Sequence, residues 1–199
     1  MGVLDQIRDL FGAFHLDPKD ICTPLSRNRH YSVISTNGHH PNAEIFPHVR
    51  ALTQAGRAHT LCILCHGYAG ENEAARVCID AGGGGLQLGR DDLTHDTVKR
   101  WAAIKGCAKN IVVYSCAAAS TLSGSEFTAQ DGEYLMGALS VVTGSTVYAA
   151  TQVQWYDPTT FDFKDWEGKL LKFEPSGAPP DRAIAPPVPI AKVLAGDAR

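Results

Sequence analysis

The sequence predicts an α/β protein with a mostly parallel sheet covered by helices on both faces, a three-layer α/β/α architecture. Strand-like apolar runs alternate with helical patterns along the chain, and such alternation is typical of parallel sheets with helical crossovers. The runs at 61–67 and 111–116 are almost continuously apolar, as expected of strands buried on both faces. A length of 199 residues suits one domain with a substantial core.

The first half of the chain predicts two helices and two strands. Apolar residues at helical spacing predict an amphipathic N-terminal helix that packs on the body, formed by Val3, Leu4, Ile7, Leu10, Phe11 and Phe14. A loop over 17–29 and a strand over 31–35 follow. A helix is expected over 43–55, with Pro47 tolerated in its first turn and Gly56 ending it. The apolar strand over 61–67 comes next.

Glycine and apolar patterns define the second half. Residues 76–88 predict a hairpin, two short strands around the run Gly82–Gly85. A helix through Val98, Trp101 and Ile104 is expected, with Asp91, Asp92 and Thr94 as N-cap candidates and Gly106 at its end. The strand over 111–116, a helix over 133–142 and a strand over 145–151 follow. No regular pattern continues after Gln152, and an ordered aromatic loop is expected over 155–163.

These patterns divide the chain into three parts. Residues 1–30 are expected to form the N-terminal helix and a loop, and residues 31–174 the α/β domain. Residues 175–199 hold most of the prolines and are expected to form an extended, weakly packed tail.

Composition excludes several classes of function. Apolar residues make up 44% of the chain, charged residues 20%, and the net charge is −3, which argues against a nucleic-acid partner. No run reaches the ~18–20 apolar residues of a membrane span. Charged residues interrupt the N-terminal pattern, so no signal peptide is expected. The six cysteines lack framework spacing, and a cytoplasmic protein is expected, with delivery by a specialised secretion system left open.

Two strands end on reactive side chains. The run Leu61 to Gly67 carries His66 at its end, and the run from Ile111 ends on Cys116. In open α/β sheets, ligands bind at the carboxyl ends of the strands. Neighbouring strands would bring an imidazole and a thiol to one crevice, which is the pair that a cysteine nucleophile requires. The backbone amides of Gly67 and Cys116 are candidate donors to an oxyanion.

The chain resembles the caspase-like cysteine peptidases, clan CD, which have the caspase/haemoglobinase fold. The resemblance covers about residues 31–154 and rests on an apolar strand ending in His66-Gly67 and a later one ending in Ser115-Cys116. The segment Gly85 to Gly89 is similar to that of bacterial members. The resemblance implies a dyad of His66 and Cys116, oxyanion donors at Gly67 and Cys116, and peptide hydrolysis through a thioester.

The expected substrate pocket departs from the family pattern. Members that cut after basic residues often carry an acid two residues before the cysteine, where this chain has Tyr114. The arginine with which caspases bind aspartate has no clear counterpart. By position alone, the pocket candidates are Tyr114, Ser115, Gln152, Gln154 and Trp155. Glu71 and Glu73, just past the histidine, are expected to be solvated loop charges, with attraction of a basic substrate as the alternative.

Other motifs carry less weight. Cys62-x-x-Cys65-His66 matches the haem-attachment pattern, but residues three apart on a strand point to opposite faces. A zinc site from these residues and Cys78 fails on the same geometry unless the chain turns sharply at Cys65-His66. The glycine run lacks the residues of a phosphate loop. His95 is expected to be solvent-exposed at a helix start.

The leading interpretation is therefore a cysteine endopeptidase that acts on a protein or peptide substrate and requires no metal or other cofactor. The alternative is a catalytically inactive caspase-like fold that acts as a protein-binding module. Scissile-bond preference, activation and oligomeric state remain open at this point.

Overall fold

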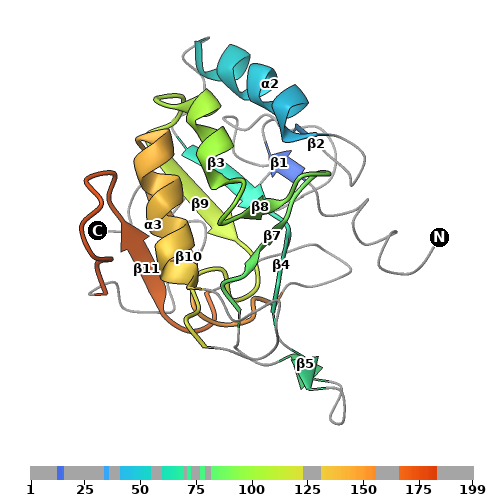
Figure 1. The fold of residues 1–199 in the computed structure, drawn as a ribbon, viewed down its shortest axis with the longest axis vertical. Helices are drawn as coiled ribbons and strands as arrows, with labels where there is room; N and C mark the ends of the chain where they lie inside the picture. Colours follow the sequence, from blue (N-terminus) through green and yellow to red (C-terminus); the bar gives the residue numbers. More distant parts are fainter. Residues whose placement is uncertain are drawn as a thin grey trace, which may run out of the picture.

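The computed structural model describes residues 13–15, 34–35, 41–54, 60–69, 71–72, 77–78, 82–122, 131–155 and 166–182. These residues form a mixed α/β fold built on one central sheet (Figure 1). The predicted N-terminal helix pattern before Ala13, most of the aromatic loop and residues 183–199 lie outside the described residues.

The central sheet has the strand order β11-β10-β9-β3-β1-β2. The three strands at its centre run parallel, β3 beside β9 and β9 beside β10, and the remaining pairs are antiparallel. The bounds of the six strands are Ala13–His15 (β1), Ile34–Ser35 (β2), Thr60–Leu64 (β3), Asn110–Tyr114 (β9), Thr146–Ala150 (β10) and Leu170–Phe173 (β11). The predicted strands at the sheet centre are thus confirmed, and the parallel part is limited to them.

Short strands form two smaller sheets beside the carboxyl end of β3. In one, β4 (His66–Gly67) pairs antiparallel with β7 (Gly85–Gln87), which pairs in turn with β8 (Leu93–Thr94). In the other, β5 (Glu71–Asn72) pairs with β6 (Val77–Cys78). The chain therefore leaves the central sheet directly after β3.

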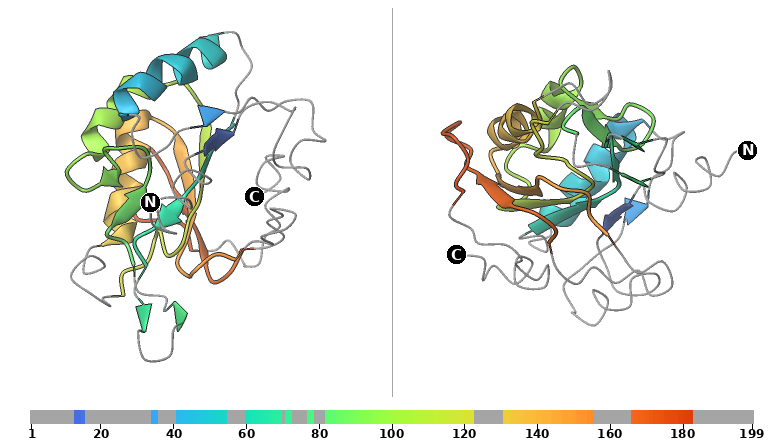
Figure 2. Two further views of the ribbon diagram at one scale, coloured as in Figure 1. Left: turned by 90° about the vertical axis from the view of Figure 1, so that its right-hand side faces the viewer. Right: turned by 90° about the horizontal axis from the view of Figure 1, so that it is seen from below.

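In the described part of the chain, three helices cover one face of the sheet: α2 (Asn42–Gln54), the 3₁₀ helix η1 (Val98–Ile104) and α3 (Gly132–Thr143) (Figure 2). Their inward side chains share one apolar core with alternate residues of the strands. Phe46 of α2 packs edge-on against Trp101 of η1, with ring centroids 5.4 Å apart. The Asp131 side chain caps α3 by accepting the Tyr134 amide at 3.0 Å, and Gly144 ends the helix in the left-handed conformation.

The opposite face of the sheet has a second apolar cluster. It comprises Cys62, Leu64, Val112, Tyr114, Tyr148, Ala150, Trp166 and Leu170. Among the described residues, Trp166 is the large side chain that covers this face, and its ring lies 4.9 Å from that of Tyr114. Helices on both faces, and hence three full layers, stay a prediction.

Two predicted elements are wrong. Phe14, assigned from its spacing to the N-terminal helix, lies in β1, where it pairs with Ile63 of β3. The hairpin around Gly82–Gly85 does not form, because β6 pairs with β5 and β7 pairs with β4 and β8. In the first case the partner strand is distant in sequence, which local spacing does not reveal, and in the second each short strand pairs with another neighbour instead of across the glycine run.

Two further features differ from expectation. The sequence Leu170–Phe173, where no strand was expected, forms β11, an edge strand antiparallel to β10. The helix at Val98–Ile104 is present as a 3₁₀ helix whose N-cap is Thr97, not the expected Asp91, Asp92 or Thr94.

No helix among the described residues is long and apolar enough to cross a membrane.

Candidate functional site

The parallel pairing of β3 and β9 brings the two reactive segments to the same edge of the sheet. Leu64 lies opposite Tyr114 in the register, and the Cys65 amide extends the pairing by donating to the Tyr114 carbonyl at 3.4 Å. Beyond the strand ends, His66 directly follows Cys65, and Cys116 directly follows Ser115. Both residues therefore lie at the carboxyl edge of the parallel strands, as predicted.

Gly67 lies in direct contact with the backbone of Cys116. A Cβ at Gly67 would sit 1.9 Å from the Cys116 carbonyl oxygen and 3.0 Å from Ser115 Oγ. No side chain fits in that space, so a glycine after the histidine is required sterically. This contact brings the His66–Gly67 and Ser115–Cys116 segments together.

A sharp, anchored turn follows Cys116. Ala117 has a positive φ of 49°, which is uncommon for a residue with a side chain. Its amide donates to the Gln152 carbonyl at 2.9 Å, and the Ala119 amide donates to the Ala150 carbonyl at 3.0 Å. The turn is thus held against the end of β10 and leaves Cys116 half-buried.

The glycine run packs beneath this turn. A Cβ at Gly82 would lie 2.5 Å from the Ala117 Cβ, and the Gly82 amide donates to the Leu122 carbonyl at 3.1 Å. The run was interpreted as the turn of a hairpin. The structure shows a different reason for glycine at position 82: its backbone lies so close to the segment after Cys116 that a side chain would not fit.

The two candidate catalytic side chains are half-buried. The Cys116 thiol donates to the Gln154 carbonyl, with 3.6 Å between Sγ and the oxygen. Burial lowers the pKa of His66 from its ordinary value of 6.5, because desolvation disfavours the imidazolium ion. At neutral pH the imidazole is therefore mostly uncharged and able to accept a proton.

The thiols of two other cysteines, Cys62 and Cys65, are expected to be unreactive. Burial raises the pKa of both Cys62 and Cys65 to about 12. The two belong to apolar clusters on opposite faces of the sheet, which is the geometry expected to prevent a haem-attachment or zinc site. Within the described ranges, no group of three or more histidine, cysteine and acidic residues could hold a metal ion.

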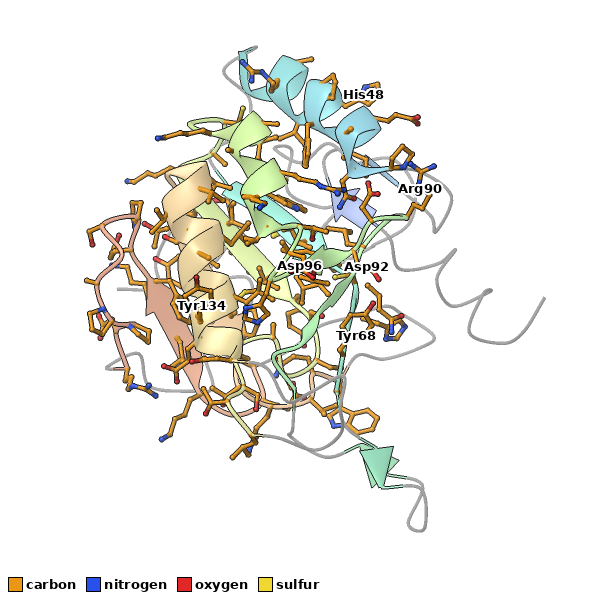
Figure 3. The ribbon with its side chains drawn as sticks, in the orientation of Figure 1. His48, Tyr68, Arg90, Asp92, Asp96 and Tyr134 are labelled. Atoms are coloured by element: carbon orange, nitrogen blue, oxygen red, sulfur yellow. The ribbon has the colours of Figure 1, made fainter. Side chains whose placement is uncertain are left out.

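Asp92 secures the strand that carries His66, a role that the sequence did not suggest. Its carboxylate accepts hydrogen bonds from the Tyr68 hydroxyl and, at 3.0 Å, from the Leu88 amide. Figure 3 shows Tyr68 and Asp92 on neighbouring segments beside β4. Asp92 has a φ of 52°, so it forms a turn rather than a helix cap. In the sequence, Gly89 and Arg90 just before it were the residues that could have indicated a turn here.

Residues 152–155 form a wall beside Cys116. Of the pocket candidates, Tyr114, Ser115 and Gln154 are buried and Gln152 is exposed. Tyr114 is only 3% exposed. Its ring packs on Trp166 and its hydroxyl donates to the Trp155 carbonyl at 3.1 Å, so its side chain supports the wall from behind. Ser115 is buried next to Cys65, with 3.9 Å between its Oγ and the sulfur. Trp155, in contrast, is 64% exposed.

Gln154 ties two segments of the wall together. Its side-chain amide donates to the Gln152 carbonyl at 2.9 Å and to the Glu167 carbonyl at 2.8 Å, and its side-chain oxygen accepts the Glu167 amide at 3.2 Å. A Cβ at Gly168 would collide with the Gln152 side chain at 2.5 Å. The segment 166–168 was not singled out from the sequence, because its link to Gln154 is a tertiary contact.

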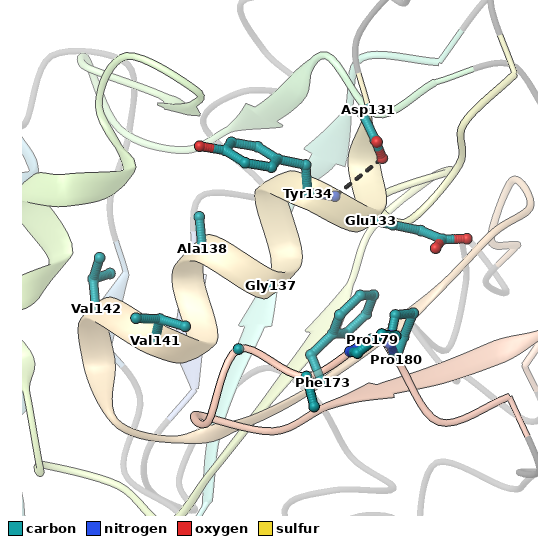
Figure 4. A pocket seen from close by; sticks show the side chains of 12 residues that line it. Asp131, Glu133, Tyr134, Gly137, Ala138, Val141, Val142, Phe173, Pro179 and Pro180 are labelled. Carbon is teal, nitrogen blue, oxygen red and sulfur yellow. Dashed lines mark hydrogen bonds between the residues drawn. The ribbon is translucent and has the colours of Figure 1, made fainter.

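A separate groove lies between α3 and the segment after β11 (Figure 4). It has a volume of about 510 Å³ and is lined by Asp131, Glu133, Tyr134, Gly137, Ala138, Val141, Val142, Phe173, Gly177, Ala178, Pro179 and Pro180. Its lining contains no cysteine or histidine, so nucleophilic chemistry of the kind considered at Cys116 does not belong there.

His95, expected at a helix start and exposed, is half-buried. Its ring stacks on Tyr134 with 5.6 Å between the centroids, and its Nε2 lies 3.3 Å from the Gly83 carbonyl oxygen. The expectation of a solvent-exposed side chain is therefore wrong, and the residue connects α3 to the glycine run.

Comparison with protein-family models, with curated proteins and with solved structures finds no match to this chain. The class of site is therefore argued from the residues and their geometry.

Proposed function

We propose that the protein is a caspase-like cysteine endopeptidase in which Cys116 is the nucleophile and His66 the general base and acid. The contact of Gly67 with the Cys116 carbonyl carries this proposal. It joins the two segments that hold the imidazole and the thiol at the carboxyl edge of parallel strands, where α/β proteins bind ligands. The half-buried setting of both side chains supports it further.

The reaction follows from these two groups. His66 accepts the thiol proton while the sulfur attacks the substrate carbonyl, which gives a tetrahedral oxyanion. The amides of Gly67 and Cys116 are proposed to donate to that oxygen. The imidazolium then donates its proton to the leaving amine as the carbon–nitrogen bond breaks. Water, deprotonated by His66, attacks the remaining thioester and releases the acid.

The lowered pKa of His66 favours general-base catalysis over a preformed thiolate–imidazolium pair. Because the base must be unprotonated, kcat/KM should fall as the pH decreases through the His66 pKa, and that limb should lie below the ordinary value of 6.5. Rates in H₂O and D₂O across pH 4–8 would measure this. We expect a solvent isotope effect above 1; an acid limb above 6.5 would contradict the assignment.

Peptide hydrolysis is tested with a library of peptides that sample every residue on both sides of the bond. The full chain is incubated with the library, and new termini are identified by mass spectrometry. We expect cleavage by the wild type and none by His66→Ala. A library left intact by the wild type across salt and calcium concentrations would contradict the peptidase and favour the inactive binding module.

A further inference from the structure

We propose that Tyr68 and Asp92 form a positioning pair for His66: the hydrogen bond between their side chains holds β4, and with it the imidazole, in place relative to Cys116. This inference rests on the proposed function, since it assigns two further residues to the same reaction. Neither side chain is proposed to touch the substrate. Both act through the strand that carries the histidine, so their effect belongs to the rate of the chemical step.

The strand that carries the histidine is short and lies at the edge of its small sheet. β4 has two residues and pairs with β7 on one side. Just before it, the Cys65 amide donates to the Tyr114 carbonyl at a long 3.4 Å, and just after it, the Tyr68 amide donates to the Gly85 carbonyl at 3.0 Å. A strand of this length forms few backbone hydrogen bonds, so side-chain contacts at its ends contribute much to its position.

Tyr68 is held by its ring as well as by its hydroxyl. A Cβ at Gly85 would lie 2.9 Å from Cδ2 of Tyr68, so the ring occupies the space where the facing residue of β7 would otherwise have a side chain. The hydroxyl donates to the Asp92 carboxylate (Figure 3). Hydrogen bonds to an ionised acceptor are stronger than those between neutral groups. The Tyr68 side chain therefore ties the end of β4 to the turn before β8.

Asp92 is itself fixed by several segments of the fold. Its carboxylate accepts the Leu88 amide at 3.0 Å. Its backbone carbonyl accepts the hydroxyl of Thr97, the N-cap of η1, at 2.9 Å and the side-chain amide of Asn42, the first residue of α2, at 3.3 Å. Displacing this carboxylate would require breaking contacts with two helices. The pair therefore connects the position of the histidine strand to the helical layer.

The test replaces Tyr68 by phenylalanine, which keeps the ring and removes only the hydroxyl. On the library peptide that the wild type cleaves fastest, we expect kcat to fall roughly 10-fold, because a small displacement of a catalytic group slows the chemical step, with KM within about 2-fold. Asp92→Asn should also lower kcat, and the double variant should fall no further than the worse single variant, because both changes weaken the same hydrogen bond. Asparagine tolerates the positive φ of this turn.

A spectroscopic measurement distinguishes positioning from a general loss of stability. The chain has eight histidines, and NMR of histidine labelled with ¹³C in the ring reports on each imidazole, with His66→Ala assigning the signal of interest. Tyr68→Phe should shift or broaden the His66 signal and leave the others in place. Spectra and kinetics are recorded where urea titration shows each variant to be fully folded, so unfolded chains do not contribute.

Tyr134→Phe is the matched control. It removes the same hydroxyl from an exposed side chain on α3 and should leave both kcat and the His66 signal unchanged. An unchanged kcat or an unmoved His66 signal in Tyr68→Phe overturns the positioning role, and so does an equal loss of kcat in Tyr134→Phe. Absence of hydrolysis by the wild type contradicts the peptidase, whereas the His66 signal still decides whether Tyr68 positions the imidazole.

Discussion

Replacing Cys116 by alanine is expected to abolish peptide hydrolysis, with kcat falling on the order of 10⁵-fold. The change removes the atom proposed to form the thioester, and the neighbouring thiols of Cys62 and Cys65 cannot replace it, because they are buried with pKa values of about 12. The fold should persist, since the sulfur is half-buried and its hydrogen bond to the Gln154 carbonyl is long. Steady-state kinetics and thermal unfolding of the same preparation measure both effects.

Alkylation provides the control that does not depend on finding a substrate. Iodoacetamide should modify Cys116 well below pH 8 and faster than Cys107, which is also half-buried but lies far along the chain from His66. His66→Ala should remove this difference. Peptide mapping of the modified chain gives the rate at each cysteine. Equal labelling of the two thiols in the wild type would contradict activation of Cys116 and favour the binding module.

Substituting Gly67 by alanine should also impair catalysis strongly, although less than removing the nucleophile. The added Cβ would sit 1.9 Å from the Cys116 carbonyl oxygen, so β4 and the Cys116 segment would have to separate. A displacement of about 1 Å in a catalytic geometry can cost about 10²-fold in rate, and overpacking costs roughly 1–3 kcal/mol of stability. We therefore expect kcat/KM to fall at least about 10²-fold, together with a lower unfolding midpoint in urea.

Gly137→Ala is the matched control for this substitution. Gly137 lies within α3, and a Cβ there would meet its nearest neighbour, a Phe173 ring carbon, at an ordinary 3.9 Å. Helix propensity favours alanine by roughly 0.5–1 kcal/mol, so this variant should be as stable as the wild type or more so, with unchanged activity. Full activity in Gly67→Ala would show that the contact with Cys116 is not part of the catalytic geometry.

The wall beside Cys116 illustrates how a core residue can shape a site without facing it. Tyr114 packs on Trp166 from the side of the sheet opposite the helices and bonds the Trp155 backbone. Its position two residues before Cys116 suggested a pocket residue. Alternation along β9 instead directs the side chain into the second apolar cluster, and the surface is left to Trp155 and Glu167.

Much of the fold could be predicted because it depends on local patterns. The central strands β3, β9 and β10 are continuous apolar runs, and α2 and α3 show helical spacing with recognisable ends. These signals lie within each segment. Strands β1 and β11 escaped prediction because each exists through pairing with a strand far away in sequence, which supplies hydrogen bonds that no local pattern encodes.

At the candidate site, local sequence patterns were enough to predict that a histidine and a cysteine follow buried strands. The departure of β4 from the central sheet, the packing of Gly67 and Gly82 against the segment around Cys116, and the nearby positions of Asp92 and Glu167 became visible in the folded chain alone. The difference lies in the distance along the chain over which each feature arises. Which residues end a strand follows from neighbouring side chains, whereas steric contacts and hydrogen bonds between remote segments exist only once the chain has folded.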